Sequence, residues 1–399
     1  MKKDSNKKIT TIIYEIQENI GNRPTATSDE KIAHRYIKNI FEEYTDNIIF
    51  EPFKCNPRSE QHEILLFCVI YCLALLGYIF YPLFAPFILI IYFINFGIIK
   101  FFDIRFTDIF AKKSTSHNLI AKFMSKNELP PETPEQSSEV FSNKNKNLIF
   151  TANIDSPYIS KIYGNNLRKY YLKIKEYFHI SFYIFFIISL IKVLNIIPFF
   201  DDYIYLLPFL LIGFIAFFYE INISYEKSFG ANNNMSGTAI LVALAEELKK
   251  IELKNINVYL CLFGAKNANS AGSKFFVNKY FKDLTNSEVI NLTSLSGDNL
   301  FLITRENDYK INNNLNLVNK IQKIAENINI KLYRSHININ TDSAPFSYEK
   351  IPSTTITSLD QDLIPLRYNI KDDLPQYIKE EQLIKVFDIC RELIRVKNV

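Results

Sequence analysis

The sequence predicts an α/β protein with a mixed, mainly parallel sheet flanked by helices, and with four transmembrane helices arranged as two hairpins. Three observations lead to this fold class. Residues 64–99 contain no charged side chain, and a second apolar block covers residues 177–219. After residue 146, apolar strand-like runs alternate with helix-like runs, a pattern typical of a helix-covered parallel sheet.

The first apolar block is too long for one membrane span. A single helix over 64–99 would be roughly 54 Å long, whereas the hydrocarbon core of a bilayer is about 30 Å thick. Pro82 and Pro86 lie near the middle of the block, where a turn between two spans is expected. The sequence therefore predicts two membrane helices, over about 64–81 and 84–100.

The second apolar block is interrupted by Pro198 and by Asp201 and Asp202. This pattern again predicts two spans, near 177–198 and 203–220. Lys192 lies inside the first of them, and we expect its ammonium to reach toward the polar turn. Buried helices of a soluble core are the alternative, but soluble helices of this length normally keep a polar face.

Basic residues flank both hairpins, whereas the two short turns carry no Arg or Lys. By the positive-inside rule, this pattern predicts a multi-pass membrane protein whose hydrophilic parts are all cytoplasmic. Each hairpin returns the chain to the same side, so the polar parts can form one domain. We expect that domain to comprise residues 1–62, 101–175 and 221–399, with hairpins at 63–100 and 176–220. The flanking basic residues are Lys100, Arg105, Lys112, Lys113, Arg168, Lys169, Lys173, Lys175 and Lys227.

The bulk composition excludes some partners. The formal net charge of the 399 residues is only +4, which gives no reason to expect a nucleic acid partner. The bilayer and an unidentified protein or peptide are the partners that we expect. The five cysteines have no metal-site or disulfide spacing, so we expect reduced thiols.

The polar part is expected to contain strands at 147–153, 256–264, 288–297 and 299–304. Ser236 is a candidate N-cap for a helix in which apolar residues recur at helical spacing. Further helices are expected after residue 270, near 311–328 and near 379–396. A site in such a sheet is expected at the carboxyl ends of the strands.

Seven short motifs, taken in order, resemble those of the co-catalytic zinc aminopeptidases, the M28 peptidases. Outside the hairpins, the resemblance covers nearly the whole chain and implies a three-layer aminopeptidase-like fold. Each motif alone is weak, but their order is specific. The motifs are GNRPTATSDEKIAHRYIKNIFEEY (21–44), SHNLIAKF (116–123), FTANIDSPY (150–158), GANNNMSGTAILVALAEEL (230–248), LFGAKNANSAGSKFF (262–276), VINLTSLSG (289–297) and TDSAPFSYEKIPSTTI (341–356).

The resemblance also implies which positions would bind metal. Such a site needs imidazoles and carboxylates around two zinc ions, and a glutamate that acts as general base. Here the first histidine position is Asn153, the bridging aspartate position is Asn233, and the general-base position is Lys266. The other ligand positions are Asn267, Thr293 and Ser343. The supporting aspartates Asp155 and Asp342 are retained, and the nearby Asp298, Glu306 and His336 do not restore a ligand pair.

Zinc is the cofactor of related active enzymes, but these substitutions predict no cofactor here. We expect a membrane-anchored, catalytically inactive aminopeptidase-like protein, a pseudopeptidase with a binding or scaffolding role. We also expect the Lys266 ammonium to replace part of the metal charge through an ion pair with Asp155 or Asp342. Two alternatives remain open: an active membrane-bound zinc aminopeptidase with an atypical metal site, and a membrane protein whose hairpins carry the function.

Overall fold

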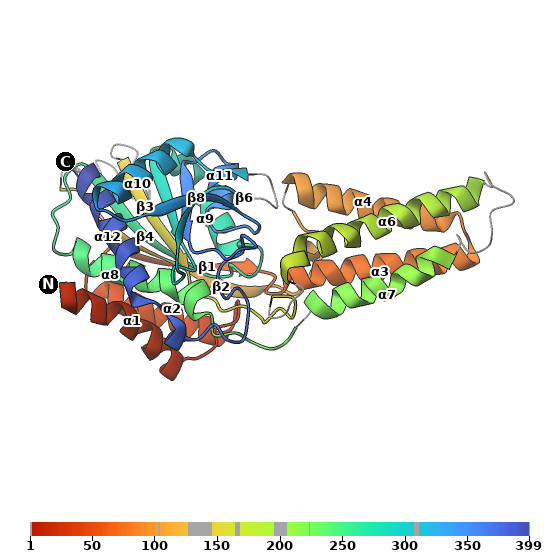
Figure 1. Cartoon of the computed structure of the whole chain (residues 1–399), viewed down its shortest axis with the longest axis horizontal. Coiled ribbons are helices and arrows are strands. Elements are labelled where there is room, and N and C mark those ends of the chain that lie inside the picture. Colours follow the sequence, from red (N-terminus) through yellow and green to blue (C-terminus); the bar gives the residue numbers. More distant parts are fainter. Residues whose placement is uncertain are drawn as a thin grey trace. The chain divides into compact units, whose positions relative to one another are not determined.

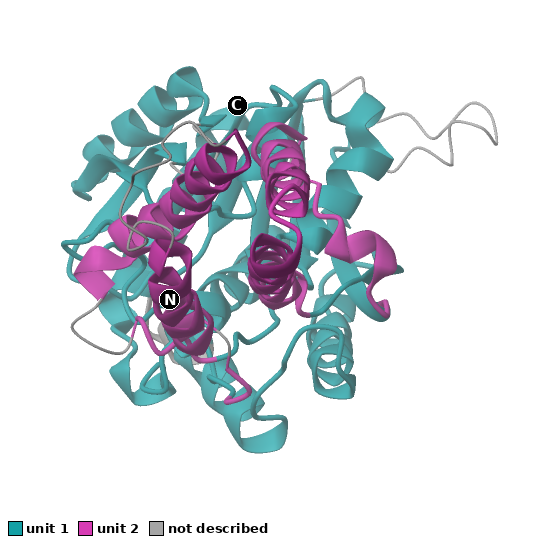
Figure 2. Cartoon of the chain, turned by 90° about the vertical axis from the view of Figure 1, so that its right-hand side faces the viewer, with its two compact units in different colours: residues 1–57, 114–158, 227–399 teal, residues 58–113, 159–226 magenta. Residues whose placement is uncertain are grey.

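The computed structural model describes residues 2–102, 104–126, 146–163, 168–194, 206–222, 224–306 and 311–398, with side chains from residue 9 onward. The chain divides into two compact units, coloured separately in Figure 2. The sheet unit consists of residues 1–57, 114–158 and 227–399, and the helical unit of residues 58–113 and 159–226.

The sheet unit is built on a nine-stranded sheet among the described residues, in the order β1-β2-β4-β3-β5-β9-β6-β7, with β8 paired to β6 (Figure 1). The middle strands β4, β3, β5 and β9 are parallel, and antiparallel pairs lie toward both margins. The sheet is therefore mixed, with its parallel part at the centre. The strands are β1 (Ile48–Cys55), β2 (Ser114–Phe123), β3 (Lys146–Asn153), β4 (Ile256–Phe263), β5 (Ser287–Leu292), β6 (Leu300–Glu306), β7 (Ile311–Asn312), β8 (Leu332–Ile337) and β9 (Ser353–Thr357).

Helices cover both faces of the sheet, and side-chain alternation assigns the two faces. Leu148 and Phe150 of β3 join a core that includes α1, α2, α8, α10 and α12, whereas Ile149 joins a core with α9 and α11. This is the expected three-layer arrangement. The helices are α1 (Lys2–Asn19), α2 (Ser28–Glu42), α8 (Ser236–Leu248), α9 (Ala271–Tyr280), α10 (Leu315–Asn327), α11 (Ala344–Tyr348) and α12 (Glu380–Lys397).

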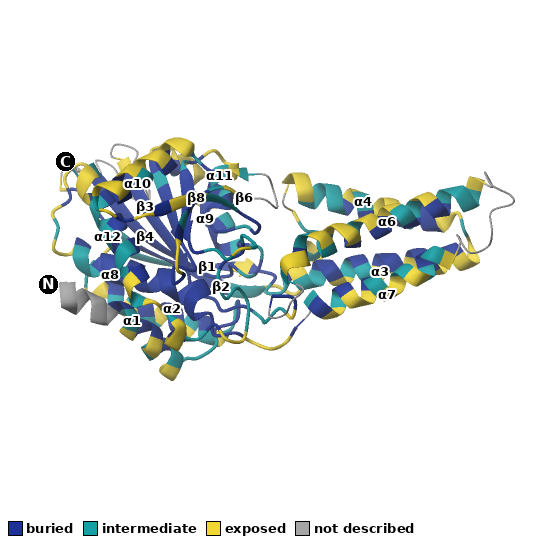
Figure 3. Ribbon diagram, in the orientation of Figure 1, coloured by how far each residue is buried: buried dark blue, intermediate teal, exposed yellow. Residues whose placement is uncertain are grey.

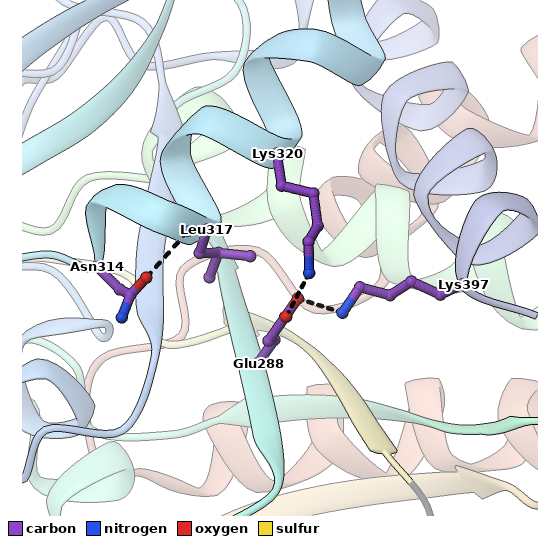
Figure 4. A network of polar contacts seen from close by, with 5 residues as sticks. All are labelled: Glu288, Asn314, Leu317, Lys320 and Lys397. Carbon is purple, nitrogen blue, oxygen red and sulfur yellow. Dashed lines mark hydrogen bonds and ion pairs between the residues drawn. The ribbon is translucent and has the colours of Figure 1, made fainter.

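Two local expectations were wrong. Ser236 is not an N-cap, because a turn of π-helix (Ala231–Met235) precedes α8 and the Ser236 hydroxyl donates back to the Asn232 carbonyl. The helix expected from residue 311 begins instead at Leu315, where Asn314 caps it by accepting the backbone N–H of Leu317 (Figure 4). The short strand β7 takes up the preceding residues.

A partly buried ion-pair cluster joins β5 to two helices of the sheet unit (Figure 4). The carboxylate of Glu288 in β5 accepts a hydrogen bond from the ammonium of Lys320 in α10 at 2.6 Å. It also accepts one from the ammonium of Lys397 in α12. Burial raises the pKa of Glu288, but Lys397 and Lys320 outweigh it and lower the pKa overall. The charged carboxylate therefore stabilises the contact between the sheet and both helices.

The helical unit contains the two apolar blocks. Its helices are α3 (Ser59–Phe80), α4 (Phe84–Phe102), α5 (Thr107–Phe110), α6 (Tyr171–Leu194) and α7 (Leu207–Asn222). Its core is rich in aromatic rings, among which Tyr92 stacks on Phe182 with ring centroids 3.8 Å apart. Unlike the strands of the sheet unit, these helices carry long exposed stripes (Figure 3). The exposed residues are largely apolar, among them Phe84, Phe87, Ile91 and Leu210.

Among the described residues, three helical segments are long and apolar enough to cross a membrane: Ser59–Phe80, Phe84–Phe102 and Arg168–Leu194. The fourth expected span corresponds to α7, a shorter apolar helix, so the structure supports three spans by length and not four. The turn expected around Pro198, Asp201 and Asp202 lies outside the described residues. The Lys192 ammonium contacts Tyr78, at 3.2 Å from its carbonyl oxygen and 3.9 Å from the centre of its ring.

Candidate functional site

Asp155 binds the turn that contains the former general-base position. It follows β3 by two residues and accepts the backbone N–H groups of Lys266 and Asn267, each at 3.0 Å. The side-chain amide of Asn267 and the hydroxyl of Thr25 also donate to it, at 2.9 and 2.7 Å. Three of these hydrogen bonds go to Oδ2 and one, from the Lys266 N–H, goes to Oδ1, so both oxygens have protein donors. The structure therefore brings Asp155, Lys266 and Asn267 together, with Asp155 held by protein donors.

The same turn is held at its start by Glu30, which the sequence analysis did not single out. Glu30 is buried in the first turn of α2 and accepts the backbone N–H of Ala265 at 2.9 Å and the hydroxyl of Ser116. Burial raises its pKa to about 8. Two carboxylates thus hold three successive N–H groups, at 265–267. Ala265 itself has a φ of 55°, a left-handed conformation that residues other than glycine rarely adopt.

The Lys266 ammonium is buried and donates to the hydroxyl of Tyr368 at 3.4 Å. It also lies 4.9 Å from the centre of that ring. Burial lowers the pKa of Lys266, but the negative charges around it outweigh burial and raise the pKa overall. The interaction with Tyr368 raises the pKa of Lys266 most, followed by the charges of Asp342 and Asp155. The expected direct ion pair is absent from the described contacts, and the aspartates act on Lys266 at longer range.

Asn233 and Thr293 are in direct contact. The Thr293 hydroxyl donates to the Asn233 carbonyl at 2.8 Å, and the Asn233 amide donates to the side chain of Asn369 at 3.0 Å. The turn before α8 is held by Asp373, whose carboxylate accepts the backbone N–H groups of Asn232 and Asn233 at 2.7 and 3.0 Å. Burial raises the pKa of Asp373 to about 6.

Asn153 ends β3 and is 1% exposed. Its backbone carbonyl accepts the hydroxyl of Thr238 at 3.0 Å, but its side-chain oxygen and nitrogen have no hydrogen-bond partner among the described residues. Asn234, fully buried in the neighbouring turn, is in the same state. A buried amide without partners costs about 1–3 kcal/mol. No contact among the described residues therefore offsets the cost of burying the side chains of Asn153 and Asn234.

Asp342 and Ser343 are adjacent in sequence but have different partners. Asp342 accepts the hydroxyl of Ser273 at 2.7 Å, and burial raises its pKa to about 6. Ser343 donates to Glu306 at 2.7 Å, in a buried cluster with the hydroxyls of Thr341 and Thr355. Burial raises the pKa of Glu306 to about 7. Among the described residues, Ser343 forms no hydrogen bond with any of the other candidate positions.

Glu306, which the sequence does not place among the ligand positions, is the last residue of β6 and contacts Ser343, the final ligand position. It does not make a metal site, since its neighbours in the cluster are hydroxyl groups. Across the described residues, no three His, Cys, Asp or Glu side chains gather as a metal site would need.

The site residues do not fit the zinc pair that the resemblance implies. Zinc prefers imidazole, thiolate and carboxylate ligands, whereas the corresponding positions hold amides, hydroxyls and an ammonium. The retained carboxylates bind protein donors instead: both oxygens of Asp155 accept hydrogen bonds from the protein, and Asp342 accepts the hydroxyl of Ser273. The ammonium of Lys266 would also repel a dication.

Some residues of this site could be found from sequence and others could not. Arg23, in the first family-like motif, is fully buried and donates to the carbonyls of Ile154 and Phe229. The motif that contains Arg23 was the sequence feature from which it could have been found. Glu30 lies in the same motif as an ordinary helix-start residue. Asp373 follows a lysine and another aspartate, and no sequence pattern distinguishes it from solvent-exposed residues.

Comparisons with known proteins agree with the fold. The model of peptidase family M28 matches residues 219–394, somewhat less than half of the chain. A comparison with curated protein sequences finds no match.

Solved structures with the same fold include enzymes of two kinds. A glutaminyl cyclase from Bacteroides thetaiotaomicron has a TM-score of 0.58 at 10% identity, covering 98% of this chain and 97% of its own. A zinc aminopeptidase from Bacillus subtilis has a TM-score of 0.57 at 14% identity, covering 98% and 95%. A zinc-dependent exopeptidase from Parabacteroides distasonis has a TM-score of 0.57 at 11% identity, covering 98% and 97%. At these identities, the similarity establishes the fold alone. The chain thus resembles peptidase family M28, in sequence over residues 219–394 and in fold over nearly its whole length.

Proposed function

We propose that this protein is a membrane-anchored pseudopeptidase, in which an M28-like sheet unit is kept for binding or scaffolding and does not hydrolyse peptides. The single observation that carries the proposal is the state of Asp155. In place of orienting a metal ligand, it accepts four hydrogen bonds, two of them from the backbone of the turn that carries Lys266 and Asn267.

The chemistry at the general-base position supports the same conclusion. A general base must accept a proton from the attacking water, but the pKa of Lys266 is raised and its amine stays protonated at neutral pH. A protonated amine cannot accept that proton. Metal binding and proton abstraction are therefore both disfavoured by residues of this chain.

The anchor is proposed on the apolar helices. Three helical segments have the length and composition of membrane spans, and their exposed side chains are large and apolar. We propose that they hold the sheet unit at the cytoplasmic face, because basic residues concentrate at the flanks of the hairpins. Accessibility of cysteines introduced at Lys371 and at Tyr81 to a membrane-impermeant maleimide in intact and opened cells tests this orientation. Labelling of position 371 in intact cells would contradict it.

We propose that the sheet unit binds a peptide, a small polar ligand or a protein partner without hydrolysing it. Asn153 and Asn234 are buried and lack partners among the described residues, so a ligand with donors and acceptors would relieve a real cost. Thermal stabilisation by free amino acids and short peptides, measured on the purified full chain, is the direct assay. The matched variants are Asn153→Ala and Asn234→Ala.

Activity tests the proposal against its main alternative. The full chain in detergent should not hydrolyse aminoacyl-anilides, with or without a chelator, and should not cyclise N-terminal glutaminyl peptides. The Bacillus subtilis zinc aminopeptidase serves as the positive control for hydrolysis. Turnover that the chelator abolishes would overturn the proposal and identify an active metalloenzyme with an atypical site.

A further inference from the structure

We propose that residues 101–113, which we call the interfacial segment, lie in the headgroup layer of the membrane and bind anionic lipid headgroups through Lys112 and Lys113. The inference rests on the proposed membrane anchoring and adds to it a lipid class and a site. All the residues concerned belong to the helical unit.

Two polar side chains of the interfacial segment, those of Arg105 and Thr107, are directed toward α3. Arg105 donates to the hydroxyl of Ser59 at 3.4 Å, and the Thr107 hydroxyl donates to Glu63 at 2.9 Å. Glu63 is only 5% exposed and also accepts the side-chain amide of Asn95 in α4. The segment is therefore folded back on the first turns of α3 by specific polar contacts.

The apolar side chains of the segment are directed outward. Phe110 is 84% exposed, the highest value for a large hydrophobic residue in the described part of the chain. Phe101, Phe102, Ile104 and Ile109 are also more than half exposed. A water-facing segment would bury these side chains and expose its polar ones. In the interfacial segment the apolar side chains are exposed instead. An apolar neighbour that covered these side chains would stabilise this arrangement.

The position of the segment indicates which apolar neighbour this is. The candidate span α4 ends at Phe102, so the exposed aromatic side chains begin where a membrane helix would leave the hydrocarbon. Aromatic residues concentrate at this depth in membrane proteins. Continuity with the span therefore favours the membrane surface over a protein partner.

The charges of the segment favour an anionic surface. Lys112 and Lys113 are exposed and form no ion pair among the described residues, and Lys100, just before the segment, is exposed as well. Basic residues close to the span attract anionic headgroups, and an apolar side chain inserted beside them keeps them there. Within residues 100–113, four basic side chains outnumber two acidic ones.

The chain contains no tryptophan, which makes a clean test possible. Phe110→Trp in the otherwise native full chain gives one fluorescent reporter. The protein is reconstituted in vesicles of phosphatidylcholine and phosphatidylglycerol in which either lipid, but not both, carries brominated acyl chains. We expect quenching by brominated phosphatidylglycerol to exceed quenching by the brominated zwitterionic lipid about twofold at equal mole fraction. High salt, or the double variant Lys112→Gln and Lys113→Gln, should remove the difference.

Two matched reporters separate the possible failures. Phe87→Trp, at an exposed position within α4, should be quenched equally by both lipids, and Leu315→Trp in the sheet unit should not be quenched. If position 87 is quenched and position 110 is not, the inference is wrong and the anchoring stands. Equal quenching at position 110 by both lipids would overturn the anionic preference. If neither position is quenched, the anchoring itself fails. Ile109→Trp is the second reporter if Phe110→Trp does not fold.

Discussion

The carboxylate of Asp155 accepts the backbone N–H of Lys266 at 3.0 Å, although 111 residues separate the two in sequence. With the adjacent N–H of Asn267, this contact fixes the turn that follows β4 to the end of β3. Hydrogen bonds from the protein stabilise the charge of this buried carboxylate. Replacing Asp155 is therefore the most informative change at the site.

We predict that Asp155→Asn lowers the free energy of unfolding by about 2–3 kcal/mol. An amide in place of the carboxylate presents an N–H donor to one of the two backbone donors, which then loses its acceptor. Denaturant unfolding of the full chain in detergent measures the loss. Asp298→Asn changes an exposed carboxylate and should cost less than about 0.5 kcal/mol. Equal effects of the two variants would show that the hydrogen bonds of Asp155 contribute no special stability.

Lys266→Glu should be strongly destabilising, by about 2–4 kcal/mol, because it adds another acid near Asp155 and Asp342 and removes a cation that interacts with both. Lys266→Met, which removes the charge alone, should cost less. Thermal unfolding of the two variants beside Lys371→Glu, at an exposed lysine, is the measurement. An unchanged or higher melting temperature for Lys266→Glu would mean that the ammonium does not compensate the aspartates.

Glu306 gives a pH-dependent prediction. Burial raises its pKa from 4.5 to about 7, so between these pH values the folded protein binds more protons than the unfolded chain. Stability must then fall as pH rises through this window, by up to about 3 kcal/mol from this one group.

Glu306→Gln removes that dependence. The difference in unfolding free energy between the wild type and the variant should therefore decrease as pH rises from about 4.5 to about 7 and stay level above it. Asp373 titrates in both proteins and cancels in the difference, whereas Asp342 interacts with Glu306 and so contributes to the same pH dependence. A difference that does not vary with pH would exclude a raised pKa at Glu306.

The Glu288 cluster of Figure 4 predicts a stability effect far from the candidate site. Glu288→Gln should cost about 1–3 kcal/mol, since it leaves the largely buried ammonium of Lys397 without its carboxylate. Glu246→Gln is the control, because Glu246 pairs with the exposed Lys250 one helical turn away and should contribute less than about 0.5 kcal/mol. If both variants lose the same stability, burial gives the cluster no added strength.

Much of the fold could be predicted because its signals are local. The apolar runs at β3 and β4 and the uncharged blocks of the helical unit express burial directly in sequence. The N-cap at Ser236 was mispredicted because the π-helical turn before α8 depends on Asp373, which lies 137 residues later. No periodicity near residue 236 contains that information.

The candidate site was predictable only in part, for the same reason. Strand-end residues such as Asn153 follow from the pattern, because parallel strands bring their carboxyl ends to one edge. Their partners do not follow from it. Ser343 and Glu306 meet across 37 residues of sequence, and Glu30 reaches Ala265 across 235 residues. Tertiary packing alone decides these contacts.

The zinc content of the native protein tests the central claim most directly. The full chain, purified from membranes without chelators and with zinc present throughout, is analysed by elemental mass spectrometry beside the Bacillus subtilis zinc aminopeptidase. We predict zinc far below stoichiometric amounts, because amides, hydroxyls and an ammonium occupy the positions where zinc needs imidazole and carboxylate ligands. About one or two zinc ions per chain, retained on dialysis and lost in Asn153→Ala or Asn233→Ala, would contradict the account.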